Sequence, residues 1–222
     1  MERLKLVEPA ASLWRMAGPT IERALEALQD GPHEWRFGGG TILATRWRHR
    51  LSFDIDLMVT ENADLRELTP EYNAGFERAI RQLGGEPKFA PGKYDIDFQT
   101  GTIEICKLDP TPAVGERPYV IEEREETVLS TTQILCGKLE RAPRSPVRDV
   151  FDFIVARQAD PGALAAAANS LYEGHARAVA AHWERNNRRF EDEATKDLNG
   201  VTARFQSDFR TLGTQAGDAL LG

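Results

Sequence analysis

The segment at residues 51–59 constrains the fold most, because Asp54 and Asp56 alternate there with apolar side chains. Successive side chains of a β-strand point to opposite faces, so this pattern predicts a strand that buries its apolar residues and presents both carboxylates on the other face. Two like charges held this close repel each other. A divalent cation relieves that repulsion, and Mg²⁺ is commonly held by one or two carboxylates together with substrate phosphates.

Three glycines at residues 38–40 stand shortly before the acidic strand. We expect a short strand at residues 34–37 and a helix at 41–50, with the glycines at the turn between them. A tight turn is the common role of a glycine run. At the start of a helix, however, glycine lets the backbone approach a phosphate, and the first amide groups favour an anion. The pattern therefore predicts a phosphate site beside the two acids.

The order of these motifs resembles the AbiEii/AbiGii toxin branch of the polymerase β-like nucleotidyltransferase superfamily. The matching residues are Gly-Gly-Thr at 39–41 and His-Arg-Leu-Ser-Phe-Asp-Ile-Asp at 49–56. That branch also has a lysine followed by Arg-Asp-x-x-Asp, which Lys138 and Arg-Asp-Val-Phe-Asp at 148–152 match. The resemblance covers roughly residues 34–155. Two departures are a glutamate as the third acid and a proline-containing loop after Lys138.

The resemblance implies an α+β fold, in which a nucleotidyltransferase-type mixed sheet is flanked by helices and followed by a helical C-terminal region. We expect a catalytic core at residues 1–125 and a helical domain at 126–222 that completes the nucleotide-binding cleft. The implied enzyme uses Mg²⁺ or Mn²⁺ to transfer a nucleoside monophosphate from an NTP to an acceptor hydroxyl. A tRNA 3′ end is the preferred acceptor, and a separately encoded antitoxin or a phage-defence role is implied.

The resemblance also assigns the site residues. The implied metal ligands are Asp54, Asp56 and Glu104, which together with Lys138 are the catalytic residues. The implied nucleotide contacts are Gly39, Gly40, Thr41, Arg50, Ser52, Lys138, Asp149 and Asp152. Two alternatives stay open: Asp97 can replace Glu104 as the third acid, and Asp149 and Asp152 can instead form a structural salt-bridge network with Arg148 and Lys138.

Composition is ordinary for a globular protein, with 41% hydrophobic and 28% charged residues. The net charge of -7 disfavours indiscriminate nucleic-acid binding, although arginines cluster near residues 46–50 and 141–148. Only Cys106 and Cys136 are present, without metal-ligand or disulfide spacing. The N-terminus lacks a signal-peptide pattern and no segment is long and apolar enough to span a bilayer, so we expect a cytoplasmic protein without membrane contact.

The remaining pattern predicts a hairpin and several helices. The hairpin comprises residues 94–98 and 102–106, and a loop at 108–118 leads to a short strand at 119–121. Expected helices are 20–29, 69–83, 133–139, 147–157, a long one at 161–183, and one more within 190–221.

Two other functions fit the same residues. One is a nucleotidyltransferase that modifies a small molecule or a protein, and the other is a nucleotide-binding module without catalysis. Labelled NTPs and total tRNA distinguish the first from an RNA-modifying enzyme, and calorimetry with Mg²⁺ and NTP tests the second.

Overall fold

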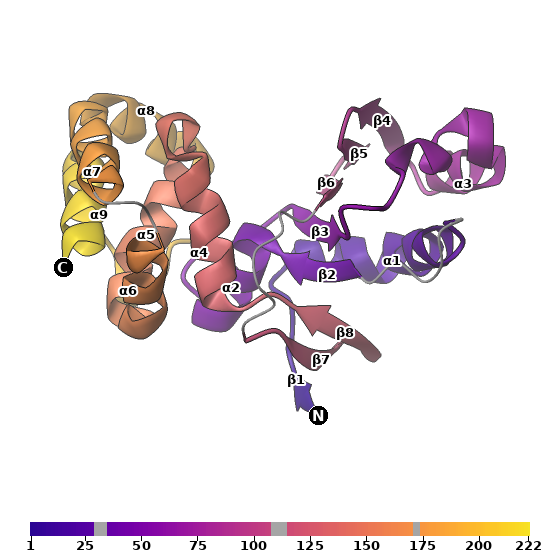
Figure 1. Ribbon diagram of the computed structural model, residues 1–222, viewed down its shortest axis with the longest axis horizontal. Coiled ribbons are helices and arrows are strands. Elements are labelled where there is room, and N and C mark those ends of the chain that lie inside the picture. Colours follow the sequence, from indigo (N-terminus) through magenta and orange to yellow (C-terminus); the bar gives the residue numbers. More distant parts are fainter. Residues whose placement is uncertain (29–34, 108–114, 171–173) are drawn as a thin grey trace. The chain divides into compact units, whose positions relative to one another are not determined.

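The computed structural model describes residues 1–28, 35–107, 115–170 and 174–222. It divides into two compact units (Figure 1). The sheet unit contains Met1–Thr45 and Ser52–Leu129, and the helical unit contains Arg46–Leu51 and Ser130–Gly222. The boundary between the units falls after Leu129, whereas the expected catalytic core ends at residue 125. The segment Arg46–Leu51, which precedes the acidic strand, belongs to the helical unit.

The sheet unit is built on one mixed sheet, which in its described part has the strand order β1-β7-β8-β2-β3-β6-β5-β4. The strands are β1 (Glu2–Arg3), β2 (Trp35–Gly38), β3 (Ile55–Val59), β4 (Glu86–Ala90), β5 (Lys93–Phe98), β6 (Gly101–Lys107), β7 (Arg117–Ile121) and β8 (Arg124–Val128). β2 runs antiparallel to β3, and β3 runs parallel to β6. The predicted hairpin is confirmed as β5 and β6, whereas β4 and β8 are additional strands.

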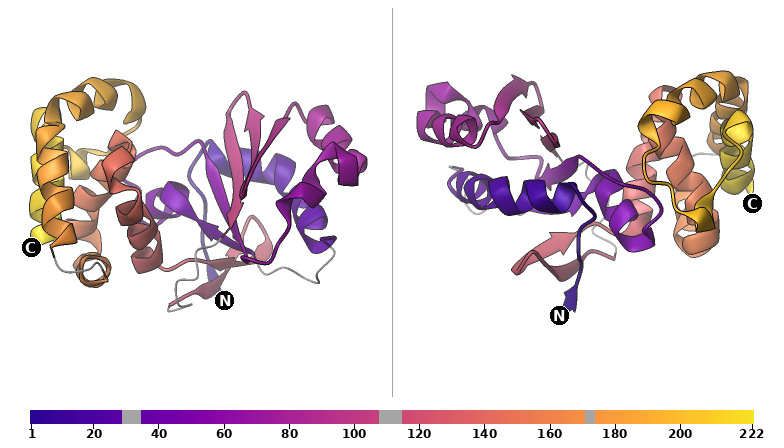
Figure 2. Two further views of the ribbon diagram at one scale, coloured as in Figure 1. Left: turned by 45° about the horizontal axis from the view of Figure 1, so that its top comes forward. Right: turned by 180° about the vertical axis from the view of Figure 1, so that it is seen from behind.

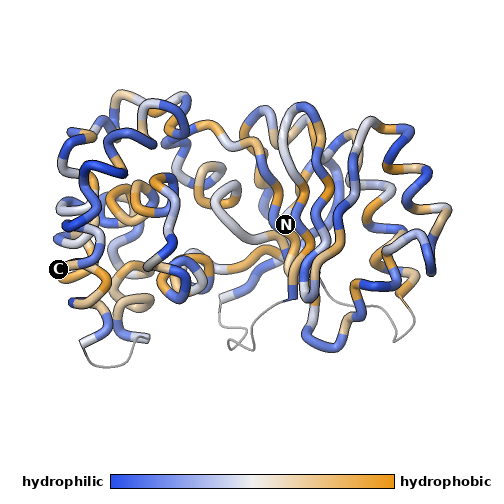
Figure 3. The backbone as a smooth tube through the Cα atoms, turned by 90° about the horizontal axis from the view of Figure 1, so that it is seen from above, coloured by the Kyte–Doolittle hydropathy of each residue, from blue (hydrophilic) through white to orange (hydrophobic). Residues whose placement is uncertain are grey.

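One face of the sheet forms the core. Phe37, Leu57, Ile105 and Tyr94 lie opposite one another across β2, β3, β6 and β5, and all are buried. Hydrophobic and hydrophilic residues alternate along these strands (Figure 3). This alternation agrees with a sheet that buries one face and carries polar side chains on the other.

Helices α1 (Ala10–Glu26) and α3 (Pro70–Gln82) cover this apolar face. Trp14 of α1 packs edge-on against Phe37 at a centroid distance of 4.7 Å, and Phe76 of α3 lies 6.0 Å from the Tyr94 ring. α1 begins well before the predicted residue 20. Residue 29, where this helix is predicted to end, lies outside the described residues. α2 (Gly39–Trp47) follows β2 directly, as the glycine run predicts.

The helical unit contains six α-helices among its described residues. They are α4 (Thr131–Glu140), α5 (Val147–Ala159), α6 (Pro161–Asn169), α7 (His175–Arg185), α8 (Asn187–Asp197) and α9 (Leu212–Leu221). Ser130 begins α4 with a capping box, in which its hydroxyl accepts from Gln133 N and the Gln133 side chain accepts from Ser130 N. The helix thus begins at Thr131, slightly before the predicted residue 133.

Two helix predictions in this unit are wrong. The single helix at 161–183 is divided between α6 and α7, and Gly174 before α7 has a φ of 83°, which a continuing helix excludes. Residues 171–173 lie outside the described chain. The expected last helix is likewise divided into α8 and α9. α9 packs along α7 (Figure 2), and a Cβ at Gly213 would lie 2.0 Å from Trp183 O, so glycine permits this close approach.

Within the described ranges, the helices are all too short or too polar to cross a bilayer.

Candidate active site

The glycine turn and Asp56 are in direct contact in the sheet unit. Gly39 begins α2 with a φ of 65°, a conformation that favours glycine. β2 and β3 pair so that Gly38 lies opposite Asp56, and a Cβ at Gly39 would lie 1.6 Å from Asp56 Oδ2. The Asp56 carboxylate therefore packs against the backbone at the first turn of α2, where a phosphate is also favoured.

Thr41 and Ser52 tie α2 to the start of the acidic strand. The Thr41 hydroxyl donates a hydrogen bond to Asp54 O. Its Oγ1 lies 2.6 Å from Ser52 Oγ, and because the Thr41 proton is already engaged, Ser52 is the donor of this second bond. Both side chains are buried. The two predicted phosphate contacts therefore position the Asp54 backbone in this structure.

Two of the three candidate carboxylates lie on neighbouring strands, Asp56 on β3 and Glu104 on β6, whereas Asp54 directly precedes β3 instead of lying on the predicted strand. Asp54 Oδ1 accepts a hydrogen bond of 3.3 Å from Thr102 N, and Asp56 lies opposite Glu104 in the parallel pairing of β3 and β6. Residues opposite each other on paired strands share a face of the sheet. The sequence thus correctly places Glu104 beside Asp56.

The side chain of Glu104, however, is engaged elsewhere. Glu104 Oε2 lies 2.5 Å from Lys93 Nζ, and the same ammonium group lies 3.3 Å from Asp95 Oδ2. The alternative acid, Asp97, contacts Lys88 at 2.5 Å and accepts from the Thr102 hydroxyl at 3.0 Å. Accordingly, no group of three or more His, Cys, Asp or Glu side chains is gathered to hold a metal ion in the described part of the chain.

The residues do fit a divalent cation in a simpler arrangement. Asp54 and Asp56 supply the hard oxygen donors that Mg²⁺ prefers, and such a site is completed by substrate phosphates. The absence of a Cβ at Gly39 lets the Asp56 carboxylate lie at the start of α2. A carboxylate at an anion-binding turn, with a second acid directly before the same strand, matches the needs of a cation that enters with a nucleotide.

The other predicted residues form a buried ion cluster in the helical unit. Asp152 Oδ1 lies 2.7 Å from His49 Nε2 and 3.1 Å from Arg50 Nε, while Asp152 Oδ2 lies 3.1 Å from Lys138 Nζ. Lys138 also donates to Asp149, which accepts from Arg141 Nε at 3.1 Å. The pairing of both acids with Lys138, which the sequence left open, is present, and Arg50, His49 and Arg141 take part in addition.

Opposite charges hold the cluster in its ionised form. Asp152 is fully buried, yet Arg50 and Lys138 outweigh the cost of burial and hold its pKa well below the usual range. Lys138 likewise lowers the pKa of Asp149. Burial lowers the pKa of His49, so His49 is neutral and Nε2 carries its proton toward Asp152. Removing one partner would leave a buried charge uncompensated.

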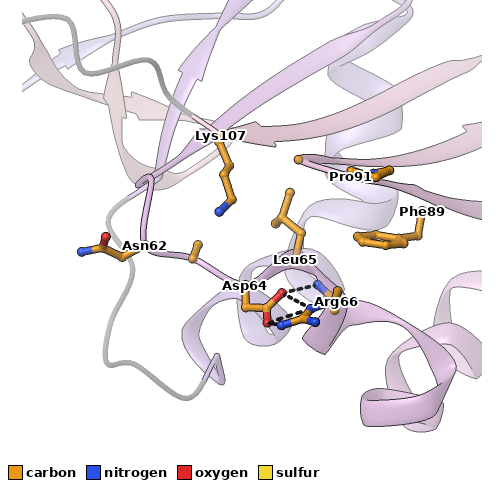
Figure 4. Close-up of a pocket in the computed structure, with 9 residues that line it drawn as sticks. Asn62, Asp64, Leu65, Arg66, Phe89, Pro91 and Lys107 are labelled. Atoms are coloured by element: carbon orange, nitrogen blue, oxygen red, sulfur yellow. Dashed lines mark hydrogen bonds and ion pairs between the residues drawn. The ribbon is translucent and has the colours of Figure 1, made fainter.

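A pocket of about 570 Å³ lies elsewhere in the sheet unit, beyond the carboxyl ends of β3 and β6 (Figure 4). Asp64, Leu65, Arg66, Phe89 and Lys107 are among its lining residues, and both carboxylate oxygens of Asp64 accept hydrogen bonds from the Arg66 guanidinium group. None of the sequence-predicted site residues lines this pocket.

Lys93 is a neighbour of the site that the motifs did not reveal. The signal for it is the alternation Lys-Tyr-Asp-Ile-Asp at 93–97, which places Lys93 on the same face of β5 as Asp95 and Asp97. Once β5 pairs with β6, Asp95 lies opposite Glu104.

A mixed sheet with a glycine turn, a helix start, a strand-borne carboxylate against that turn and a second acid directly before the same strand defines a nucleotidyltransferase. A family model described as nucleotidyl transferase AbiEii toxin of type IV toxin–antitoxin systems matches residues 23–219. The chain belongs to this AbiEii family of nucleotidyltransferase toxins. A comparison with curated proteins gave no match.

Solved structures share the fold at low sequence identity. The chain is similar to the crystal structure of a proposed nucleotidyltransferase from H. pylori, with a TM-score of 0.52, 13% identity, and coverage of 97% of this chain and 95% of that one. It also resembles an antigenic nucleotidyltransferase-like protein from Paracoccidioides brasiliensis, with a TM-score of 0.46, 13% identity, and coverage of 87% and 96%. The similarity to the H. pylori structure shows that this chain has the same fold.

Proposed function

We propose that this protein is the toxin of a toxin–antitoxin pair and transfers a nucleoside monophosphate from an NTP to an RNA 3′ hydroxyl, most simply that of a tRNA, with release of pyrophosphate. The contact between Gly39 and the Asp56 carboxylate carries the proposal. It supports an arrangement in which a triphosphate at the start of α2 lies beside a carboxylate that can hold its cation.

In this proposal Asp54 and Asp56 hold one divalent cation, Mg²⁺ or Mn²⁺, with Glu104 as the neighbouring third acid. When bound, the cation would lower the pKa of the acceptor hydroxyl and neutralise charge on the leaving pyrophosphate. Thr41 and Thr102 keep Asp54 in place through the hydrogen bonds described above. The amide groups at the start of α2, from Gly39 and Gly40, bind phosphate oxygens.

The family motif also assigns Arg50, Lys138, Asp149 and Asp152 to the nucleotide, and we retain this as a proposal. In the helical unit the Lys138 ammonium group is bound by two carboxylates. A phosphate contact by Lys138 therefore requires that it exchange one carboxylate for a phosphate.

An RNA acceptor is supported by charge in the helical unit. Arg48, Arg141 and Arg144 are exposed although the chain as a whole is acidic. Phosphate contacts by arginine supply much of the affinity for nucleic acid. Such local positive charge suits a defined RNA end better than indiscriminate binding.

The test uses each of the four NTPs, labelled either at the α- or at the γ-phosphate, with total tRNA. The proposal predicts that α-label enters tRNA and that γ-label is released as pyrophosphate. Label found in protein or in a small-molecule fraction, with tRNA unlabelled, would instead assign a different acceptor class. Absence of transfer and of Mg²⁺-dependent NTP binding would refute the proposal.

A further inference from the structure

A lysine bridges two carboxylates next to the proposed cation site. Lys93 Nζ lies 2.5 Å from Glu104 Oε2 and 3.3 Å from Asp95 Oδ2. Glu104 is the direct neighbour of Asp56 across β3 and β6, and Asp95 is the next residue in the same row on β5. The ammonium group therefore provides positive charge one strand away from Asp56.

Three acids lie side by side in this row. Asp56, Glu104 and Asp95 lie opposite one another, and Lys88 on β4 continues the row. Lys88 is committed to Asp97, at 2.5 Å. Asp95 Oδ1 is buried and has no hydrogen-bond partner in the described chain. Lys93 is thus the cation that offsets Glu104.

Asp56 and Glu104 would otherwise be close enough to act on one ion. β3 and β6 are parallel neighbours, and adjacent strands lie about 4.7–4.9 Å apart, a separation that one cation bound by both carboxylates can bridge. With Lys93 in place, Glu104 is turned to the ammonium group, and of the three candidate acids Asp54 and Asp56 remain for a cation. Two carboxylates alone hold Mg²⁺ weakly, because such sites are normally completed by substrate phosphates.

We propose that Lys93 keeps Glu104 out of the cation site, so that the divalent cation binds only together with the nucleotide. This inference rests on the proposed function and adds the order of binding to it. Lys93 is a positioning residue here, since it acts through Glu104. Its side chain is 40% exposed, so its ion pairs contribute little to folding and its replacement leaves the sheet intact.

The experiment titrates the protein with Mn²⁺, with and without a non-hydrolysable NTP analogue. Bound Mn²⁺ is measured as the loss of the electron paramagnetic resonance signal of the free ion. Wild type is expected to bind Mn²⁺ at least about tenfold more tightly when the analogue is present. Lys93→Met is expected to bind Mn²⁺ without the analogue, at least about tenfold more tightly than wild type. Lys88→Met, which releases Asp97 on the same face, is the matched control and should behave as wild type.

A double variant shows whether Glu104 is responsible. In Lys93→Met/Glu104→Gln the gain in nucleotide-free Mn²⁺ binding should disappear, because the carboxylate that Lys93→Met releases is no longer there. Circular dichroism of each metal-free variant checks its folding.

Equal nucleotide-free Mn²⁺ affinity in wild type and Lys93→Met would overturn the inference, and so would tight nucleotide-free binding by wild type. In either case Mn²⁺-dependent binding of the analogue would still support the proposed function. If wild type bound neither Mn²⁺ nor the analogue, both proposals would fail.

Discussion

The Asp56 carboxylate lies against Gly39 so closely that a methyl group at Gly39 would sit 1.6 Å from Asp56 Oδ2. The glycine thereby fulfils two requirements at once, since it adopts a φ of 65° and leaves room for the acid. This contact joins the two halves of the sequence motif.

Gly39→Ala should therefore abolish transfer. The new Cβ must displace Asp56, so we expect activity to fall by about 100-fold or more, together with loss of Mn²⁺-dependent NTP binding. The control is Gly84→Ala, because Gly84 has a similar φ of 83° but no atom within 4 Å of an added Cβ. Transfer assays and calorimetry on both variants provide the measurement. A Gly39→Ala enzyme no more impaired than Gly84→Ala would disprove the role of this contact.

Asp152→Asn should destabilise the helical unit. It leaves Arg50 and Lys138 buried without their shared carboxylate, and breaking a buried ion pair costs about 3–5 kcal/mol. Because the folded-state pKa of Asp152 is depressed, its stabilising effect is present above about pH 4 and is lost as pH falls further. Urea unfolding at pH 7 measures the loss.

The control for that experiment is Asp208→Asn. Asp208 pairs with Arg210 at 3.0 Å, but both side chains are largely exposed, so unfolding should hardly change. Equal stability of the two variants would mean that the buried cluster contributes nothing specific.

Glu126→Gln should stabilise the sheet unit near neutral pH. Burial raises the pKa of Glu126 from 4.5 to about 8. The unfolded chain therefore ionises while the folded chain stays protonated, and wild-type stability falls as pH rises from about 4.5 to 8. One pKa unit corresponds to about 1.4 kcal/mol, so the gain at pH 8 should reach a few kcal/mol.

Thermal unfolding at pH 4 and pH 8 checks this expectation. The variant and wild type should unfold alike at pH 4 and differ at pH 8, where glutamine replaces a protonated acid without charge. A difference of the same size at both pH values would argue against ionisation of Glu126 as its cause.

Arg144→Glu should weaken RNA labelling without affecting NTP binding. Arg144 is exposed in the helical unit, and loss of one phosphate contact reduces the salt slope of RNA binding by about 1. The control is Arg78→Glu, which makes the same change of charge at an exposed position of α3 in the sheet unit. It should leave RNA labelling unaltered. If the two variants lost labelling equally, only the net charge would matter.

The sequence predicted the site best where local geometry determines it. The glycine turn and the acidic segment lie together as their order along the chain predicts, with Asp56 against Gly39, and Glu104, which the family resemblance supplied, lies opposite Asp56. The contact of Lys93 with Glu104 depends on the pairing of β5 with β6 and on a side-chain conformation, neither of which spacing reveals. Lys138 was expected at a phosphate, but its two carboxylate partners come from α5, a separate helix.

Fold prediction failed where local patterns were weak. β4 contains Pro87 and lies at the sheet edge, so it lacks the alternation of a buried strand. β8 carries three charged residues, including the buried Glu126. The alanine-rich stretch from α6 into α7 has an unbroken helical pattern, and only the φ of Gly174 reveals the break.

The most direct test of the account compares wild type with Asp56→Asn in transfer of α-labelled NTP to tRNA, with thermal unfolding of both proteins measured in parallel. The account predicts labelled tRNA from wild type and a loss of about 100-fold or more in the variant, at unchanged unfolding temperature. Full transfer by a folded Asp56→Asn variant would contradict it.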